Sequence, residues 1–432
     1  MADRKITINQ VSKLNAESIR SKKTPEVIRY LDTSSITKNS ISNIQVLDSR
    51  IEPFPSRAQR KVKDKTIIYS TVRPEQEHFG FIEKKKNTDD LIVSSGFLTL
   101  DVIDKDIDPK YLYYLITQKD ITNYLQRVAS NNVSAYPSIN PDDLGSMEFS
   151  IPSDLPTQQK IAAVLSALDA KIELNARINA ELESMAKTLY DYWFVQFEYP
   201  TPPPPSHLRR DTSPKNDRST VVFGGGREGV VWNDELKRKI PLGWEALSLS
   251  EITEVSTKTV NPLNFPEREF KHYSIPAFDE TGTYKIESGK EIMSNKFTVA
   301  GSDVLVSKLN PWFNRVVYST SDKDSICSSE FVVWRTENTS LKNYLYMVAK
   351  DASFIDYCTR SASGTSHSHR RINPQVMMRY QVAYNKEIAN LFGEIINPLI
   401  AMVARNRIES QALRELRDWL LPMLMNGQVK VK

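Results

Sequence analysis

Two halves of this sequence resemble each other. Four blocks of the first half recur in the same order in the second half, displaced by roughly 233 residues. The first-half blocks are DKTIIYSTVRP, LIVSSGFLTLDV, YLYYLITQKDITNYLQRVAS and SINPDDL. Their counterparts are SDVLVSKLNP, SICSSEFVVWRT, YLYMVAKDASFIDYCTRSAS and RINPQVM. A period this long predicts two copies of one domain and not the short units of a solenoid.

The blocks predict that each copy is a mixed α/β domain. The runs TIIYSTV, FLTLDV, DVLVSKL and FVVWRT are rich in β-branched residues and bounded by turn formers, which is typical of strands. The segments that begin YLYYL and YLYMV have apolar residues at helical spacing. Each copy would have about 150 residues, which is an ordinary domain size.

A long helix is predicted after each mixed domain. The stretch from Thr157 to Phe197 contains neither Gly nor Pro, and its apolar residues recur at alternating steps of four and three, as in a coiled coil. The C-terminal region repeats this pattern until Pro422 and Gly427, which we expect to end the helix, while Pro398 would kink it or mark its start. The predicted seam residues are Leu168, Ile172, Asn175, Asn179, Leu182, Leu189, Leu399, Val403, Asn406, Leu413 and Leu420.

An isolated helix of this length cannot bury its apolar stripe, so we expect the two helices to pair antiparallel with each other. Asparagines in the seam would fix the register at a cost in stability; the alternative is that Asn175 and Asn406 are merely tolerated polar positions. The predicted fold class is α+β, with two similar mixed α/β domains separated by two long antiparallel coiled-coil helices in an internal pseudo-two-fold repeat. The predicted segments are the first domain at 1–154, a helix at 155–198, a Pro/Gly-rich linker at 199–230, the second domain at 231–386 and a helix at 387–432.

Composition narrows the function classes. A net charge of only +4 and a pI near 8.7 allow binding to a polyanion, but any nucleic-acid surface has to be local. Cys327 and Cys358 lack Cys-x-x-Cys spacing, and five histidines offer a zinc site few ligands, so we expect no metal and a reducing compartment. Without a run of roughly 18 apolar residues, we expect no membrane span and a cytoplasmic location.

The sequence resembles the specificity subunits of type I restriction-modification systems over nearly its whole length. The segments SALDAKIELNARINAELESMAKTLYDYWFVQF and ALRELRDWLLPMLMNGQV look like the two conserved helical regions of that family. SRAQRKVKDKTIIYSTVRP, SSGFLTLDV and DPKYLYYL are similar to a common version of its target recognition domain, and IPLGWEALSLSEI resembles the usual opening of such a domain. The first half departs from that opening because ITINQVSKLNAESIR lacks the Gly-Trp pair.

The resemblance implies a non-catalytic protein that reads double-stranded DNA. Each target recognition domain would read one half of a bipartite asymmetric site, and the helices would set the gap between the halves. Two methyltransferase subunits would bind the specificity subunit, and two motor-nuclease (restriction) subunits would join them. S-adenosylmethionine, ATP and magnesium would bind to those partners, so we expect no cofactor in this chain.

Two regions of each half are candidates for DNA contact, because reading needs donors and acceptors at base edges and cations at phosphates. One is the loop before each INP motif, and the other is the turn after the first strand; Lys61 and Lys63 suit phosphates. The alternative to DNA contact is that these are ordinary solvated loops. The candidates are Lys61, Lys63, Ser70, Thr71, Arg73, Asn131, Asn132, Ser134, Tyr136, Ser307, Lys308, Asn310, Arg315, His367, Ser368, His369, Arg370 and Arg371.

Two other functions compete with DNA recognition. Gly224, Gly226 and Gly229 satisfy the G-x-G-x-x-G pattern of nucleotide and methyl-donor sites, which would suit a fused S-adenosylmethionine-dependent methyltransferase, but no phosphate-binding helix is predicted after them. The pair His367 and His369 has no evident third metal ligand nearby. A coiled-coil adaptor with duplicated heads and no DNA affinity is the other alternative.

Overall fold

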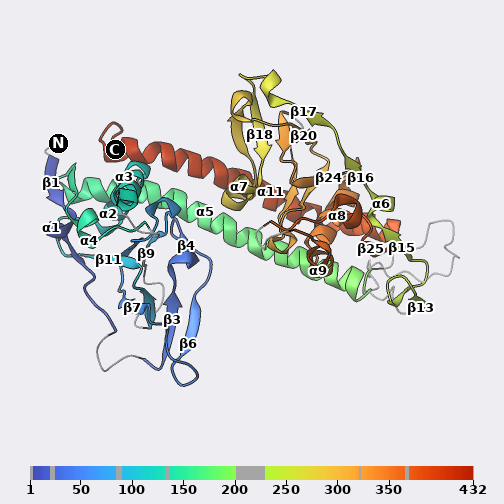
Figure 1. The fold of residues 1–432 in the computed structure, drawn as a ribbon, viewed down its shortest axis with the longest axis horizontal. Coiled ribbons are helices and arrows are strands. Elements are labelled where there is room, and N and C mark those ends of the chain that lie inside the picture. The colour runs from blue at the N-terminus through green and yellow to red at the C-terminus, as the bar shows by residue number, and fades with distance from the viewer. Residues whose placement is uncertain are drawn as a thin grey trace, which may run out of the picture. The chain divides into compact units, whose positions relative to one another are not determined.

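The computed structural model divides into two compact units, through which two long helices run. Unit 1 comprises Met1–Ala170 and Leu413–Lys432, and unit 2 comprises Lys171–Ala412. Helices α5 (Leu155–Tyr190) and α11 (Lys386–Met425) contribute residues to both units (Figure 1). The structure describes residues 3–19, 25–83, 90–131, 137–200, 229–320, 323–364 and 369–431.

Unit 1 is built on two four-stranded sheets. The first is antiparallel throughout and has the order β2 (Ser12–Leu14), β11 (Phe97–Val102), β8 (Ile67–Ser70), β9 (Phe79–Phe81). The second has the order β6 (Gln45–Asp48), β3 (Val27–Leu31), β10 (Leu91–Ser94), β7 (Ala58–Lys61), in which β3 and β10 are parallel. Short pairs join β1 (Asp3–Thr7) to β12 (Glu148–Pro152) and β4 (Ile36–Thr37) to β5 (Ser40–Ile41). Its shorter helices are α1 (Ile8–Val11), α2 (Pro109–Ile116), α3 (Lys119–Asn131) and α4 (Pro141–Gly145).

Unit 2 also contains two larger sheets. The first has the order β16 (Glu254–Ser256), β24 (Phe331–Arg335), β21 (Asp303–Ser307), β22 (Val316–Tyr318). The second has the order β17 (Thr259–Val260), β20 (Lys296–Thr298), β23 (Ser325–Cys327), β18 (Glu269–Tyr273), β19 (Lys285–Ser288). Two further antiparallel pairs are the hairpin β13 (Val230–Asn233) with β14 (Arg238–Pro241) and the long-range pair β15 (Glu245–Ser248) with β25 (Gln381–Tyr384). Its shorter helices are α6 (Leu249–Ile252), α7 (Ile275–Thr281), α8 (Thr339–Lys350), α9 (Ala352–Ser361) and α10 (Pro374–Met377).

The first sheets of the two units have matching strand order and pairing directions. β11 lies between β2 and β8 in unit 1, as β24 lies between β16 and β21 in unit 2. In the second sheets, the parallel pair β3–β10 has its match in β18–β23. The sequence blocks lie on these matching elements, so the prediction of mixed α/β domains with long helices is confirmed.

The YLYYL and YLYMV segments are apolar because helices α2 and α8 are buried. Asp108 caps α2 by accepting a hydrogen bond from the Tyr111 backbone nitrogen (2.8 Å), and Pro109 begins the helix with a preset φ. Asn338 caps α8 in the same way. Tyr111 and Tyr344 are both fully buried in the cores of their units. The caps set the start of each helix, and burial of its aromatic face stabilises it.

The long helices differ from the expectation at their ends. α5 stops at Tyr190 and is followed by a π-helical turn, Asp191–Val195. α11 begins well before Pro398, runs on through Pro422 and ends at Met425, two residues before Gly427, whose φ is 69°. Of the two residues expected to end the helix, Pro422 does not, and Gly427 lies just beyond its end. Leu424 and Met425 are buried in the core of unit 1, which offsets the backbone hydrogen bond that proline cannot make.

Polar side chains join α5 to α11 within each unit. In unit 2, the Asn175 amide donates to the Glu409 carboxylate (2.8 Å) and to Ser410 Oγ (3.2 Å), and the Asn406 amide donates to Asn179 Oδ1 (2.9 Å). The numbering rises along α5 as it falls along α11, so these segments run antiparallel. Every predicted seam residue is buried or half-buried.

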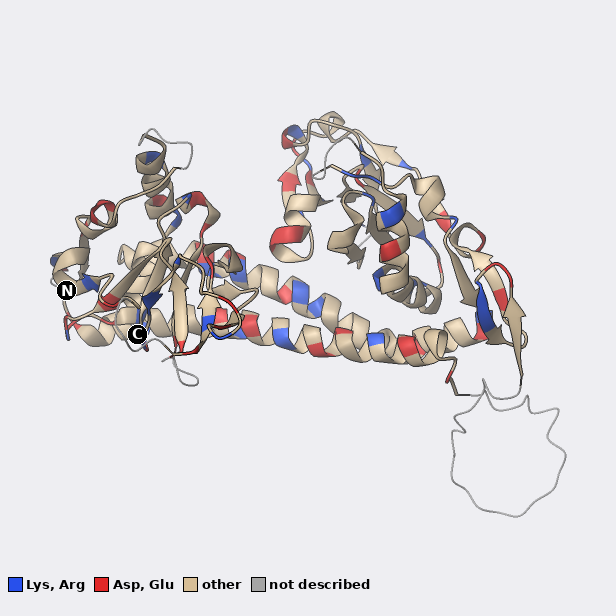
Figure 2. Ribbon diagram, turned by 60° about the horizontal axis from the view of Figure 1, so that its bottom comes forward, with Lys and Arg blue, Asp and Glu red and all other residues tan. Residues whose placement is uncertain are grey.

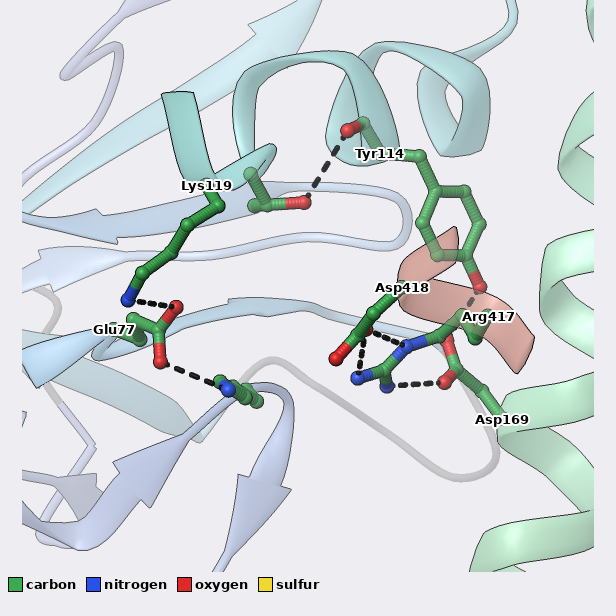
Figure 3. Close-up of polar contacts among 8 residues, drawn as sticks. Glu77, Tyr114, Lys119, Asp169, Arg417 and Asp418 are labelled. Carbon is green, nitrogen blue, oxygen red and sulfur yellow. Dashed lines mark hydrogen bonds and ion pairs between the residues drawn. The ribbon is translucent and has the colours of Figure 1, made fainter. Parts of the chain in front are cut away.

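An acidic residue of α5 anchors a shorter helix to α11 in each unit. In unit 1, the Tyr114 hydroxyl of α2 donates to Asp169 (2.6 Å), which also accepts from Arg417 of α11 (2.8 Å) (Figure 3). In unit 2, Glu183 of α5 contacts both Lys350 of α8 (2.7 Å) and Arg407 of α11 (2.6 Å). Each mixed domain is thereby tied to the helices within its unit.

Helix α11 is long and apolar enough to cross a membrane by length and composition alone. Its apolar side chains have another explanation, because Phe392, Ile396 and Ile400 belong to the core of unit 2. A core helix of a soluble protein passes the same test, so this helix is weak support for a membrane span.

Gly393 of α11 provides a test of how closely α11 packs against the start of α8. A Cβ at this position would lie 1.9 Å from the carbonyl oxygen of Ser340, in the first turn of α8. Gly393→Ala normally favours a helix by about 1 kcal/mol, but here we expect it to destabilise the protein by about 2 kcal/mol, because backbone has to move. Urea unfolding of the full chain would measure this. Glu394→Ala, at the next and exposed position, is the matched control, and equal stability of the two variants would contradict the close approach.

Candidate nucleic-acid interface

The turn after the first strand has an unusual backbone in both units. After β8, Arg73 (φ 47°) and Glu77 (φ 55°) adopt left-handed conformations on either side of the 3-10 turn Pro74–Gln76. After β21, Asn310 (φ 47°) and Asn314 (φ 48°) flank the turn Pro311–Phe313 in the same way. Left-handed backbone is rare in residues other than glycine, so this shared conformation is specified by its surroundings.

Two predicted contact residues, Ser70 and Ser307, shape this turn. The Ser70 hydroxyl donates to the Val72 carbonyl oxygen (2.9 Å), and the Ser307 hydroxyl donates to the Leu309 carbonyl oxygen (3.1 Å). Both serines are buried. The hydroxyl of Thr71, also a predicted contact, donates to the Gly96 carbonyl oxygen (2.9 Å). These groups hold the loop, while Arg73 is exposed beside them.

The structure brings the two predicted regions of each half together. In unit 1, the Arg73 nitrogen donates to the Pro137 carbonyl oxygen, and the Ile139 nitrogen donates to the Thr71 carbonyl oxygen, both at 2.9 Å. In unit 2, Asn310 and Arg370 are joined by two hydrogen bonds, of 2.8 and 3.0 Å. The turn and the loop before the INP motif therefore form one surface in each unit.

Only part of each predicted loop can be described. Asn131 is exposed at the end of α3, His369 and Arg371 are exposed, and Arg370 and Lys308 are half-buried. Lys61 ends β7, in the other sheet from β8, and the Lys63 amino group lies 3.3 Å from Asp101. The predicted contacts Asn132, Ser134, Tyr136, His367 and Ser368 lie outside the described residues.

Two arginines among the candidates are paired with acidic residues. Arg315 makes two hydrogen bonds to Asp279 (2.6 and 2.7 Å), and its side chain is largely buried. Arg371 binds Glu330 through Nε (2.9 Å) and Nη2 (3.0 Å), and this hydrogen bonding raises the pKa of Arg371 above its ordinary value. A DNA phosphate would have to compete with Glu330 for Arg371.

The effect of removing the acidic charge of this pair can be measured. We expect Glu330→Gln to strengthen binding to nonspecific duplex DNA a few-fold and to steepen the salt dependence by up to about one unit, because Arg371 is released to a phosphate. Fluorescence anisotropy between low and physiological salt would report both quantities. Glu337→Gln removes the same charge at an exposed position of unit 2; if it has the same effect, the ion pair has no special role.

Sequence analysis did not identify the exposed aromatic pair Trp312 and Phe313 in the unit 2 turn. A register comparison of the repeats would have revealed it, because Pro-Glu-Gln at 74–76 corresponds to Pro-Trp-Phe at 311–313. The partner acids Asp279 and Glu330 were also missed, since they are distant in sequence from the arginines that they bind.

The charge distribution, the glycine motif and the arrangement of possible metal ligands bear on what kind of site this chain could hold. Figure 2 shows basic and acidic segments interspersed in both units, so any DNA surface is local. Gly229 is followed directly by strand β13 and not by a helix, while Gly224 and Gly226 lie outside the described residues. In the described ranges, no group of three or more His, Cys, Asp and Glu side chains is arranged to hold a metal ion.

Comparison with known proteins identifies relatives along nearly the whole chain. Residues 5–184 match the family described as type I restriction modification DNA specificity domain. The chain is 24% identical to the specificity subunit of the type I restriction enzyme HindI of Haemophilus influenzae, covering 94% of this chain and 95% of that protein. It is 26% identical to the MjaIX specificity subunit of Methanocaldococcus jannaschii, covering 93% and 88%.

A solved structure shares the fold. The S subunit of a type I restriction-modification system from M. genitalium superposes with a TM-score of 0.53 at 14% identity, covering 98% of this chain and 96% of that one. The family match covers the N-terminal part of unit 1 and most of helix α5, and the two relatives extend the similarity through unit 2. Residues 5–184 thus match the DNA specificity domain of this family, and more than nine-tenths of the chain is similar to specificity subunits of type I restriction enzymes.

Proposed function

We propose that this subunit reads a bipartite asymmetric DNA site, one half with each mixed domain. The observation that carries the proposal is that both units present the same turn-and-loop framework with different side chains. Arg73, Glu75 and Gln76 occupy the turn of unit 1, where unit 2 has Asn310, Trp312 and Phe313. A shared scaffold with divergent contact residues is suited to reading two different half-sites.

The paired helices α5 and α11 would set the gap between the half-sites as an antiparallel coiled coil in a pseudo-two-fold repeat. With 36 and 40 residues, they are roughly 54 and 60 Å long at about 1.5 Å per residue. Successive major-groove faces on one side of B-DNA are about 35 Å apart. The helices are thus long enough for the spacing and leave surface for other subunits. Their cross-helix asparagine contacts would fix the register.

The partners of this subunit would be double-stranded DNA, two methyltransferase subunits and, through these, two motor-nuclease subunits. S-adenosylmethionine, ATP and magnesium would bind to those subunits, in the cytoplasm. In this proposal the domain layout is 1–154 and 231–386 for the readers, 155–198 and 387–432 for the helices, and 199–230 for the linker.

The test is to co-express the chain with the methyltransferase encoded beside it and to treat a plasmid library with the purified complex. Modified adenines are then mapped by single-molecule sequencing. We expect one bipartite motif with a fixed unspecified gap. A well-formed complex that modifies no DNA, or modifies it without a gapped motif, would contradict the proposal and favour the adaptor alternative.

A further inference from the structure

The turn Pro311–Phe313 of unit 2 exposes two large aromatic side chains side by side. Trp312 is 37% exposed and Phe313 is 57% exposed, and their ring centroids are 5.9 Å apart. Exposed large aromatic groups cost free energy in water, and a cluster of them commonly marks a binding surface.

The turn is held rigidly at its base. The Phe313 nitrogen donates to the Asn310 carbonyl oxygen (3.1 Å), and the Asn314 nitrogen donates to the Pro311 carbonyl oxygen (3.0 Å). Pro311 itself is buried. Arg315, which is anchored to Asp279, places its guanidinium 4.5 Å from the centre of the Phe313 ring. The aromatic pair is therefore preorganised, so little conformational entropy is lost when it binds.

The surroundings of the pair indicate a nucleic acid as its ligand. The residue that begins the turn, Asn310, is hydrogen-bonded to Arg370, and Leu309 forms a β-bridge with Arg371. Lys308 immediately precedes these residues. The aromatic turn is thus joined through backbone hydrogen bonds to a basic loop, in which Arg371 is paired with Glu330, as Arg315 is with Asp279. Stacking on bases and attraction to phosphates are the two needs of a DNA-inserting loop.

We propose that Trp312 and Phe313 form an aromatic wedge that inserts at a base step in the half-site read by unit 2 and kinks the DNA there. The inference rests on the proposed DNA-reading function and deepens it. Unit 1 has Glu75 and Gln76 at the matching positions, and an acidic side chain cannot serve as a wedge. The distortion is therefore confined to one half of the site.

A wedge contributes affinity more than sequence choice, because every base has a face on which a ring can stack. Replacing both rings by alanine should weaken cognate DNA binding by at least about fivefold without changing the methylated motif. The conservative variant Trp312→Phe with Phe313→Tyr should retain most of the affinity. Glu75→Ala with Gln76→Ala is the matched control in unit 1.

The experiment uses the complex with methyltransferase subunits and duplexes in which 2-aminopurine replaces one base at a time. In the wild-type complex, we expect a fluorescence change at one step of the unit 2 half-site, which reports unstacking. The Trp312→Ala, Phe313→Ala variant should lose that change and bind DNA at least about fivefold more weakly, with unchanged thermal unfolding and subunit composition.

The possible failures are distinguishable. A gapped motif without any fluorescence change, or a double-alanine variant that binds DNA like the wild type, overturns the wedge alone. A variant that loses its methyltransferase subunits shows that the aromatic pair contacts protein and also overturns it. Absence of a gapped motif in the wild-type complex overturns the proposed function and this inference together.

Discussion

Replacing Arg370 with alanine is expected to relax one half of the methylated motif, and replacing Asn131 with alanine is expected to relax the other half. Asn131 begins the loop of unit 1 that is hydrogen-bonded to the turn after β8, and Arg370 lies in the loop of unit 2 that is hydrogen-bonded to the turn after β21. We call these two turns the recognition turns. Arginine pairs well with guanine and asparagine with adenine, and loss of such a contact costs about 1 to 3 kcal/mol. We expect about a tenfold or larger loss of discrimination at one position in each case.

Methylation mapping of both variants would measure this, with the double variant as an additivity test. Arg379→Ala and Asn123→Ala are matched controls, because both residues are exposed in the same units and lie outside the recognition turns and loops. If Arg370→Ala weakens methylation of every sequence equally, its role is phosphate contact and not base reading. If both variants relax the same half-site, the assignment of one unit to each half is wrong.

Glu183→Ala is expected to cost about 3 kcal/mol of stability, the largest effect that we expect from a single substitution in the helices. The Glu183 carboxylate is the shared partner of Lys350 and Arg407, and all three side chains are less than one-third exposed. Removing it would leave two cations close together in a largely buried site without an anion. Repulsion between them would push α8 and α11 apart, and neither helix would keep its ion pair to α5.

Urea unfolding of the full chain, followed by circular dichroism, measures the loss. Glu183→Gln should fall between the wild type and Glu183→Ala, because the amide oxygen can still accept one hydrogen bond. Glu181→Ala, at an exposed position of the same helix, should change stability by less than about 0.5 kcal/mol. If Glu181→Ala and Glu183→Ala have the same effect, the ion cluster does not anchor the domain.

Several candidate contacts could not be assessed from the sequence because their roles depend on distant residues. Arg371 and Glu330 are 41 residues apart, and Arg315 and Asp279 are 36 apart, yet each forms a paired unit. Ser70 and Ser307 have the composition of a polar loop, but the fold turns their hydroxyls inward to backbone carbonyl oxygens. Trp312 and Phe313 resemble core residues in the sequence, and only the turn conformation places them at the surface.

The sequence by itself determined the repeated strands, the buried aromatic helices and the two long helices with polar positions in their apolar stripe. These features depend on local periodicity and capping, which neighbouring residues encode. Tertiary structure decided which charges are paired, which hydroxyls are buried and where α11 ends, since burial of Leu424 and Met425 outweighs the helix-breaking tendency of Pro422. Side chains far apart in the chain meet only after folding. What such a pair contributes to the free energy of folding depends on that contact and on the exclusion of water from it.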